Sequence, residues 1–458
     1  MKNKKHMRYL ILLLISLVSA VYTTAQQTFT LEECRLLAIK NNKELKIAGE
    51  KVKMANYERK AAITKYFPEI SATGAYLRQN EHYFNLIDFN ALGSAGALIP
   101  ENIKDFARFD IQNIWLGNIS LVQPVFMGGK IISYNQITQY AKELAESMND
   151  QQLQEIIYLT DETYWQVISL VNKKKLADAY VDLLRKMNRD VEEMITEGVA
   201  TKADGLAVKV KLNEAEMTQT KVDNGLALSR MLLAQICGLP LEDYSVNLAD
   251  EYIENLPVQA TYATANMEEA FMNRNELKSL ELAEKIYKKK EHIALSEMLP
   301  NIGLTANFLA FNTDLHPSAK NNFSNLLSVG VMVKVPLSAW WEGTYKRNSA
   351  KAETTIKKLE FLEAREKIEL QVNQSVYKVN EANKKLIASS RNMENAEENL
   401  RHANLGFEEG VIPALNLMEA QTAWVSARSD LIDAQIEVKL TDVYLTKVLG
   451  KLDIENNK

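Results

Sequence analysis

The chain has few cysteines, few histidines and no long hydrophobic run beyond its N-terminal segment. Cys34 and Cys237 are the only cysteines in 458 residues, which excludes a disulfide framework and a zinc site. We expect both to be unpaired core residues, with a disulfide in an oxidising compartment as the alternative. No stretch of about 18 apolar residues follows residue 25, so the sequence predicts that any membrane crossing uses strands.

The sequence also lacks the motifs of catalytic and metal centres. None of its histidines shares a metal-ligand motif with Cys, Asp or Glu. Gly-x-Ser-x-Gly, His-Glu-x-x-His and a phosphate-binding glycine loop are missing as well. The five histidines are His6, His82, His292, His316 and His402. We therefore predict that the protein is not an enzyme and uses no metal or cofactor.

The N-terminus carries the signals of export. Four basic residues precede an apolar run over residues 10–18, and small residues stand before a cleavage point after Ala25, with Ala20 as an alternative. This pattern predicts a signal peptide over residues 1–25. Its removal takes away four positive charges, so the net charge of −5 becomes about −9, which makes nucleic acid a poor candidate partner.

The chain contains an internal duplication. Residues 38–46 return at 270–278 with an offset of 232, whereas Glu197-Gly198-Val199 returns at 409–411 with an offset of 212. The period is too long for a solenoid repeat, so each copy is half of the protein. The first copy has about 20 extra residues, which we place in a surface loop. The predicted copies are residues 26–265 and 266–458.

Each copy contains sequence typical of a long helical hairpin. No proline or glycine occurs between residues 130 and 196, and apolar residues recur every three or four positions. Such a helix of some 65 residues is roughly 100 Å long. A glycine ends each long helix, and a second helix follows at once. The predicted hairpins cover residues 130–237 and 340–449, and shorter helices cover 31–66 and 266–298.

Between the helices lie four segments in which apolar and small polar residues alternate. They form two predicted strand pairs, at about 69–123 and 301–335. A soluble sandwich fits this alternation too, but four strands bracketed by prolines and long helices favour membrane strands. Because four strands cannot close a barrel in lipid, the chain must oligomerise around an axis. The connecting loops, about 78–112 and 312–325, then lie on the side opposite the helices.

Together these features resemble the TolC family of outer-membrane efflux proteins. The most specific segments run from Phe407 to Gln421 and, in a weaker form, from Ile195 to Asp204, while 31–42 is similar to the family's opening helix. The resemblance implies a mainly α fold with a membrane β part. It also implies a homotrimer in the outer membrane of a Gram-negative bacterium, with a 12-stranded β-barrel continuous with an α-helical barrel in the periplasm.

The resemblance further implies two kinds of functional residue. The hairpin tips would contact a periplasmic adaptor protein that links the channel to an inner-membrane pump, although the tip glycines also suit plain helix caps. Just beyond the second tip, family members often narrow the tunnel with acidic side chains. Here those positions are Asn416 and Glu419, and a solvated, outward Glu419 is the alternative. The tip residues are Gly198, Val199, Ala200, Thr201, Gly410, Val411, Ile412 and Pro413.

The sequence thus predicts an outer-membrane exit duct for small molecules in a tripartite efflux system. Two alternatives stay open: the same duct serving type I protein secretion, and a periplasmic coiled-coil scaffold without a pore. Outer-membrane lipid is an expected partner in the duct interpretation. Residues 239–265 fit neither a rod nor a strand, and the sequence assigns them no role.

Overall fold

The computed structural model describes most of the chain. The expected signal peptide, residues 453–458 of the C-terminal tail and most of the expected 312–325 loop lie outside the described residues. The residues that the structure describes are 28–80, 83–110, 113–241, 247–253, 262–312 and 323–452. The chain forms two compact units. The described residues of the helical unit fall within Met1–Lys51, Glu146–Ser279 and Leu362–Lys458, and those of the strand unit fall within Val52–Ala145 and Leu280–Phe361.

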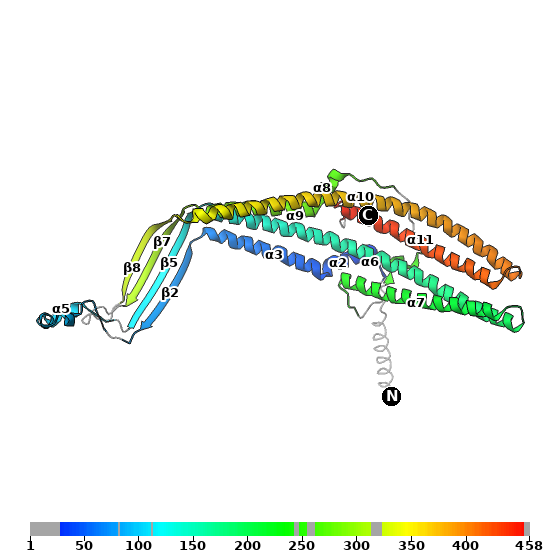
Figure 1. Ribbon diagram of the computed structural model, residues 1–458, viewed down its shortest axis with the longest axis horizontal. Coiled ribbons are helices and arrows are strands. Elements are labelled where there is room, and N and C mark those ends of the chain that lie inside the picture. The colour runs from blue at the N-terminus through cyan, green and yellow to red at the C-terminus, as the bar shows by residue number, and fades with distance from the viewer. Residues whose placement is uncertain are drawn as a thin grey trace, which may run out of the picture. The chain divides into compact units, whose positions relative to one another are not determined.

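Two helical hairpins dominate the chain (Figure 1). The first consists of α6, Lys130–Thr196, and α7, Lys202–Cys237. The second consists of α10, Ala339–Glu408, and α11, Ala414–Val448. No proline interrupts any of these helices, so their backbone hydrogen bonds run without a break.

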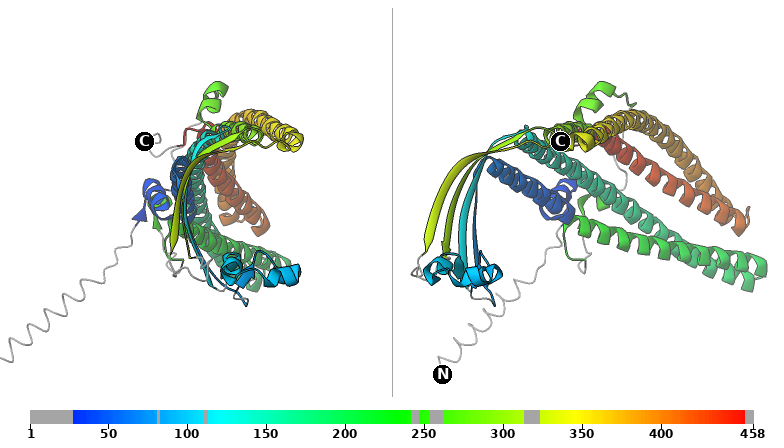
Figure 2. Two further views of the ribbon diagram at one scale, coloured as in Figure 1. Left: turned by 90° about the vertical axis from the view of Figure 1, so that its left-hand side faces the viewer. Right: turned by 60° about the vertical axis from the view of Figure 1, so that its left-hand side comes forward.

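Within the helical unit, α6 lies between α7 and α11 (Figure 2). On one side Arg185 of α6 pairs with Glu216 of α7 at 2.9 Å. On the other side Lys173 of α6 pairs with Asp433 of α11 at 2.7 Å. Such exposed pairs add little stability, but they establish the order of the helices. The second hairpin continues the series, because Lys385 of α10 pairs with Glu437 of α11 at 2.6 Å.

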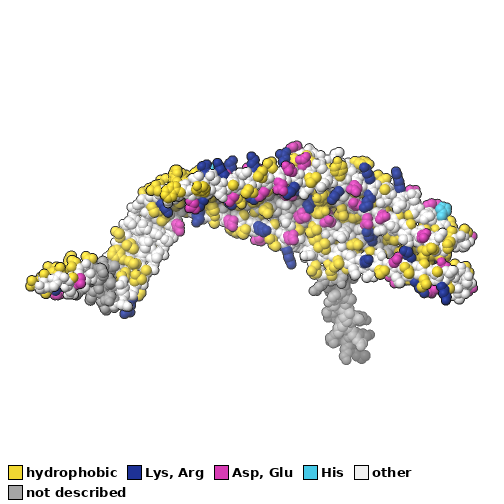
Figure 3. All heavy atoms as spheres, viewed as in Figure 1, with side chains coloured by type: hydrophobic (Ala, Val, Ile, Leu, Met, Phe, Trp, Pro, Cys, Tyr) yellow, Lys and Arg dark blue, Asp and Glu magenta, His cyan; other side chains and the backbone are white. Residues whose placement is uncertain are grey.

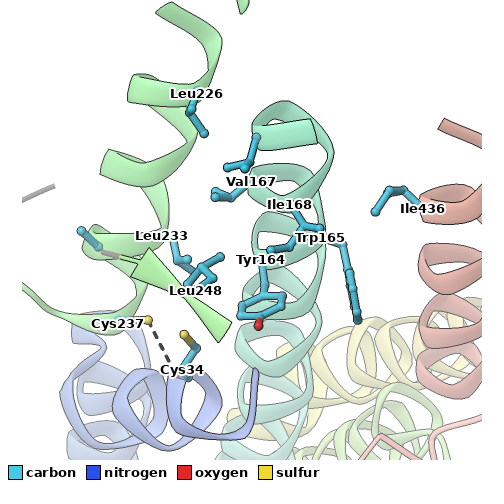
Figure 4. Close-up of a cluster of buried hydrophobic side chains, with 12 residues drawn as sticks. Cys34, Tyr164, Trp165, Val167, Ile168, Leu226, Leu233, Cys237, Leu248 and Ile436 are labelled. Carbon is cyan, nitrogen blue, oxygen red and sulfur yellow. Dashed lines mark hydrogen bonds between the residues drawn. The ribbon is translucent and has the colours of Figure 1, made fainter. Parts of the chain in front are cut away.

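The main core of the helical unit gathers around α6 (Figure 4). Its buried members come from α2 (Leu31–Asn41), α6, α7, α11 and the short strand β6 (Asn247–Leu248). They are Cys34, Tyr164, Trp165, Val167, Ile168, Val171, Leu226, Leu233, Ala234, Cys237, Leu248 and Ile436. Most are fully buried hydrophobic side chains, whose transfer from water is the chief stabilising contribution to folding.

Part of the segment without an assigned role packs against the first hairpin. β6 pairs in parallel with β1, Thr28–Phe29, and the 3-10 helix η3, Ala249–Tyr252, follows it. The Tyr164 hydroxyl donates to Asp250 at 2.7 Å, and Arg230 donates to both carboxylate oxygens of Glu251 at 2.9 Å. These contacts attach residues 247–252 to α6 and α7.

The two copies of the duplication make the same contact between helix ends. In the first copy the side-chain amide of Asn42 donates to the carbonyl of Ile236 at 3.2 Å. In the second, the guanidinium of Arg274 donates to the carbonyl of Val448 at 3.0 Å. These pairs are related by the offsets of 232 and 212 seen in the sequence. The repeat is therefore one of tertiary contacts as well as of sequence.

Each of the two shorter predicted helices, 31–66 and 266–298, is divided in the structure. The 31–66 segment forms α2, α3 (Lys43–Ile63) and the 3-10 helix η1 (Thr64–Tyr66). The break occurs because Asn42 takes an extended ψ of 131° and its side chain accepts from the N–H of Glu44 at 2.9 Å, as helix-capping residues do. The 266–298 segment likewise forms α8, Met267–Asn273, and α9, Asn275–Ser296.

The main sheet of the strand unit has four antiparallel strands in the order β2-β5-β7-β8 (Figure 1). The two predicted strand pairs are joined by β5 and β7 into this single sheet. Its strands curve together (Figure 2). The bounds are Glu69–Arg78 for β2, Asn113–Met127 for β5, Asn301–Asn312 for β7 and Ser324–Lys334 for β8.

The register gives the sheet one apolar face and one face of small and polar residues. Ile119 of β5 pairs with Ala72 and Phe308, and Phe308 pairs with Leu327, so apolar side chains align across all four strands. On the opposite face the hydroxyls of Ser71 and Ser120 lie 2.7 Å apart. The surface of the sheet seen in Figure 3 carries hydrophobic and uncharged side chains over most of its length.

The 78–112 segment, expected as a loop, contains regular structure. β3 pairs with β4 in an antiparallel ladder, and three short helical segments lie between them. Local capping explains part of this order, because the Asp88 side chain accepts from the N–H of Asn90 at 3.0 Å. The elements are β3 (Tyr83–Asn85), η2 (Phe89–Leu92), α4 (Ser94–Ala97), α5 (Glu101–Phe106) and β4 (Arg108–Asp110).

Candidate functional site

The first hairpin tip is built on a Schellman turn that ends α6. The N–H of Val199 donates to the carbonyl of Met194 at 2.8 Å, and the N–H of Gly198 donates to the carbonyl of Ile195 at 3.2 Å. Gly198 takes a φ of 76°, in the left-handed region that glycine adopts without strain. The turn satisfies carbonyls that the helix end would leave without partners.

The second tip repeats this geometry at the end of α10. Val411 donates to the carbonyl of Gly406 at 2.8 Å, Gly410 donates to that of Phe407 at 3.0 Å, and Gly410 has a φ of 70°. A Cβ at Gly410 would meet no atom within 4 Å. Backbone conformation, rather than space, therefore requires glycine here.

The tips differ in how the second helix of each hairpin begins. Thr201 and Asp204 form a capping box at the start of α7: the Thr201 hydroxyl accepts from the Asp204 N–H at 3.2 Å, and Asp204 accepts from the Thr201 N–H at 2.9 Å. Pro413 occupies the corresponding position before α11 and makes no side-chain cap. The first tip thus has a side-chain hydrogen-bonded helix cap that the second lacks.

Both tips present an apolar side chain to solvent. Val199 is 73% exposed and Val411 is 77% exposed, one residue beyond each tip glycine. The next residues, Ala200 and Ile412, are half-buried and pack against the core beneath. The matching turns therefore hold one apolar side chain in solvent at each tip, where its burial by another surface would be favourable.

One core supports both tips. Its buried members come from α6, α7, α10 and α11, so the two hairpin ends are packed together within the helical unit. They are Val181, Leu184, Met187, Val191, Val208, Ala215, Ala403, Ala414, Leu417, Met418 and Ala420. The segment from Phe407 to Gln421 is the most specific motif of the sequence. In the structure, the apolar residues of this motif beyond Pro413 serve mainly packing.

The two residues expected at the constriction lie on the exposed side of α11. Asn416 and Glu419 are exposed in the protomer, whereas Leu417 and Met418 between them are buried. Positions three apart share one face of a helix. Asn416 and Glu419 therefore face away from the tip core and stay available to line a tunnel formed by several copies.

The capping box gives Asp204 a pH dependence. Hydrogen bonds from the Thr201 side chain and backbone lower the pKa of Asp204. A lowered folded-state pKa means that the stabilisation is present above the unfolded pKa of about 4. It is lost as pH falls through the folded pKa.

We expect the amides at the start of α7 to lose protection, measured as the exchange rate relative to the intrinsic rate at each pH, as the solution is acidified below about pH 4, and Asp204→Asn to remove this loss. Hydrogen-exchange mass spectrometry reports both. The start of α11 serves as the internal control, because Pro413 makes no side-chain cap there. A pH response of equal size in the two tips would contradict the assignment.

The strand unit carries exposed aromatic side chains that were not predicted from the sequence. Directly beyond β8, Leu337, Trp340, Trp341 and Tyr345 are all strongly exposed. Near the other end of the sheet, on its apolar face, the rings of Tyr76 and Trp115 lie 4.4 Å apart. Two adjacent tryptophans soon after a proline that ends a strand were the available signal. Aromatic side chains of this kind mark membrane–water interfaces.

No cluster of three or more His, Cys, Asp or Glu side chains suited to a metal occurs in the described part of the chain. Among the same residues, no helix has the length and apolar character needed to cross a bilayer.

The chain is similar to one protein family in sequence and to several solved structures in fold. A family model described as outer membrane efflux protein matches residues 36–239 and 266–451, one segment in each copy of the duplication. A search of curated proteins finds none that matches the chain. Three of the solved structures that match are outer-membrane channels.

The outer-membrane channel OprN is 16% identical, with a TM-score of 0.75 over 92% of this chain and 90% of that one. The CmeC outer membrane channel of Campylobacter jejuni is 13% identical, with a TM-score of 0.75 over 93% and 87%. The open state of the MtrE outer membrane channel of Neisseria gonorrhoeae is 15% identical, with a TM-score of 0.71 over 93% and 91%. At these identities the likeness establishes the fold.

Proposed function

Because the chain belongs to the outer membrane efflux protein family, we propose that it is the exit duct of a tripartite efflux system. It would pass small molecules outward from a periplasmic adaptor and an inner-membrane pump. The observation that carries this proposal is a sheet with one apolar face, in the same chain as two hairpins with matching tips. The mainly α fold with a β part and the outer-membrane location are those of the family.

The sheet has the features of a membrane wall. Tyr76 and Trp115 lie on its apolar face near one end, and the exposed Trp340 and Trp341 follow β8 at the other end. Lipid-facing apolar bands flanked by aromatic girdles are typical of outer-membrane barrels. The opposite face, with its serine and threonine hydroxyls, suits a water-filled lumen.

The sheet edges support a trimer. In the described protomer β2 and β8 are the outermost strands, so each leaves one row of backbone groups without a strand partner. Unpaired N–H and C=O groups cost several kcal/mol each in hydrocarbon. Joining β2 of one copy to β8 of the next satisfies both edges, and three copies supply the twelve strands of a closed barrel.

The hairpin tips are the proposed adaptor contacts. The eight residues from Gly198 to Thr201 and from Gly410 to Pro413 include two exposed valines on rigid turns. The helix-cap explanation of the glycines is compatible with this role, because the caps fix the geometry that a partner would contact. In the same trimer, Glu419 would place three carboxylates around the axis and favour cations.

Conductance in a planar bilayer tests the proposal. Purified protein is expected to form pores, and native mass spectrometry is expected to give three subunits. If no conductance appears even after Asn416 and Glu419 are both replaced by alanine, the duct proposal is wrong. A non-conducting scaffold would give that result. A duct for type I protein secretion would conduct as well, and it differs in the pump that supplies its cargo.

Replacing Glu419 with glutamine is expected to reduce the preference of the pore for cations over anions, because three carboxylates near one axis lose their charge. The reversal potential across a salt gradient measures this change. Asn416→Ala is the matched control, since it alters the neighbouring position without changing charge, and it should leave selectivity as it was. An unchanged reversal potential in Glu419→Gln would mean that Glu419 faces outward solvent.

A further inference from the structure

The two cysteines of the chain meet in the core of the helical unit. Cys34 lies on α2 and Cys237 is the last residue of α7. Both are free thiols in the structure and both are 1% exposed. The sulfur of Cys237 lies 3.6 Å from the carbonyl oxygen of Cys34, and the two sulfur atoms are drawn close together in Figure 4. The residues are separated by 203 positions in sequence.

The backbones around this pair are held close. The side-chain amide of Asn41 donates to the carbonyl of Cys237 at 3.3 Å. A Cβ on Gly238, the next residue, would collide with the Cβ of Asn41. A disulfide requires close approach of two backbone segments, because its Cβ atoms must lie about 4 Å apart. The contacts of Asn41 hold α2 against the end of α7, and within this contact the Cys237 sulfur lies directly against the backbone of Cys34.

We propose that Cys34 and Cys237 form an intramolecular disulfide in the exported protein. The oxidant is a dithiol–disulfide oxidase protein of the compartment outside the inner membrane. One cysteine thiolate attacks the disulfide of the oxidant and forms a mixed disulfide. The other thiolate then attacks the sulfur of its partner in this chain and releases the oxidant as a dithiol. Two electrons pass to the oxidant, and the two thiol protons pass to its sulfurs by way of solvent.

The bond must form before α2 is fully docked. The contact with the Cys237 thiol and burial both raise the pKa of Cys34, and only the thiolate is an effective nucleophile. In the folded protein the thiol therefore stays protonated and out of reach of an oxidant. Once formed, the bond is equally shielded from reductants, so it acts as a permanent link rather than a switch.

The link would cyclise most of the first copy of the duplication. The loop between Cys34 and Cys237 encloses β2, β5, α6 and α7. Cross-linking so long a loop restricts the unfolded chain strongly in the chain-entropy description. The second copy provides a natural comparison, because Asn266 and Leu449 stand at the equivalent positions. It makes the same helix-end contact through Arg274 and Val448 without cysteines.

Thiol mapping of the exported full-length chain tests the proposal. The protein is extracted from membranes under acid quench, denatured and alkylated before and after reduction. We expect no alkylated cysteine before reduction and two afterwards, with a peptide pair joined through Cys34 and Cys237 in the unreduced digest. Two alkylated cysteines before reduction would overturn the proposal. A disulfide between chains, or one with a small thiol, would overturn it as well.

Single and double variants give a second, independent readout. Cys34→Ser and Cys237→Ser should each lower the thermal unfolding midpoint, and the double variant should lower it little further, because any of the three changes opens the same loop. Additive losses would show that the cysteines contribute only by packing. The mapping experiment uses the unaltered chain, so it decides the matter even if a variant folds poorly.

Discussion

Replacing Arg35 with methionine is expected to destabilise the helical unit by about 3–5 kcal/mol. Arg35 of α2 and Asp161 of α6 are 4% and 0% exposed. The guanidinium donates to both carboxylate oxygens, at 2.6 and 2.5 Å. Removing the arginine leaves a buried carboxylate without its counter-charge, which costs far more than the net value of the pair. Urea unfolding of the detergent-solubilised protein, followed by helix signal, measures the loss.

The double variant Arg35→Met with Asp161→Leu is the control, because it replaces both charges with apolar side chains. It should recover most of the lost stability. A double variant as unstable as Arg35→Met would mean that the site depends on side-chain shape rather than on charge.

The stability loss caused by Arg35→Met is expected to be smaller at acidic pH. Burial raises the pKa of Asp161 and its hydrogen bond to Arg35 lowers it, so loss of the arginine raises the folded pKa further. With the folded pKa above the unfolded value of about 4, folding takes up a proton and becomes less favourable as pH rises between the two values. The defect of Arg35→Met should therefore be smaller at acidic pH than at neutral pH. A defect of equal size at both pH values, measured against the unaltered protein, would contradict this account.

Replacing Gly410 with valine is expected to abolish adaptor cross-linking while leaving membrane insertion intact. A β-branched residue at a φ of 70° is strained by roughly 1–2 kcal/mol, so the turn relaxes and Val411 is displaced from its place at the tip. This displacement removes one of the two exposed valines that the adaptor would contact. Site-specific cross-linking to the adaptor in membranes measures the first effect, and heat-modifiable trimer formation measures the second.

Gly129 offers a matched control for this experiment. It has a φ of 84°, and a Cβ placed on it would meet no atom within 4 Å, but it precedes α6 in the strand unit and does not belong to a tip. Gly129→Val should introduce similar strain without affecting the adaptor. If both variants lose cross-linking equally, general destabilisation is the cause and the tip assignment fails.

Local sequence rules were most reliable where one periodicity continued for many residues. The absence of proline and glycine from residue 130 to residue 196 left no point at which α6 could end, because only those residues interrupt a helix strongly. Alternation along 327–335 likewise fitted β8. The break at Asn42 was missed because it depends on a single side chain that caps the following helix. Structure within 79–112 was missed because its elements are too short for a period.

The candidate site, too, could be predicted from the sequence only in part. The glycines that end α6 and α10 could be recognised from sequence, because a left-handed turn after a long helix favours glycine. The exposure of Val199 and Val411, and the burial of Leu417 and Met418, could not be. They depend on how the two hairpins pack against one another at the tips.

By itself, the sequence determined the duplication, the long helices, the two-faced strands and the family. Each of these depends on residues near one another in the chain or on a repeat within it. Only the tertiary structure decided that Arg35 meets Asp161 and that Cys34 meets Cys237. Which residues of two packed helices meet depends on the distance by which one helix is shifted along the axis of the other. Periodicity fixes the face that a helix buries, but that distance along the axis is chosen by the packing of the whole core.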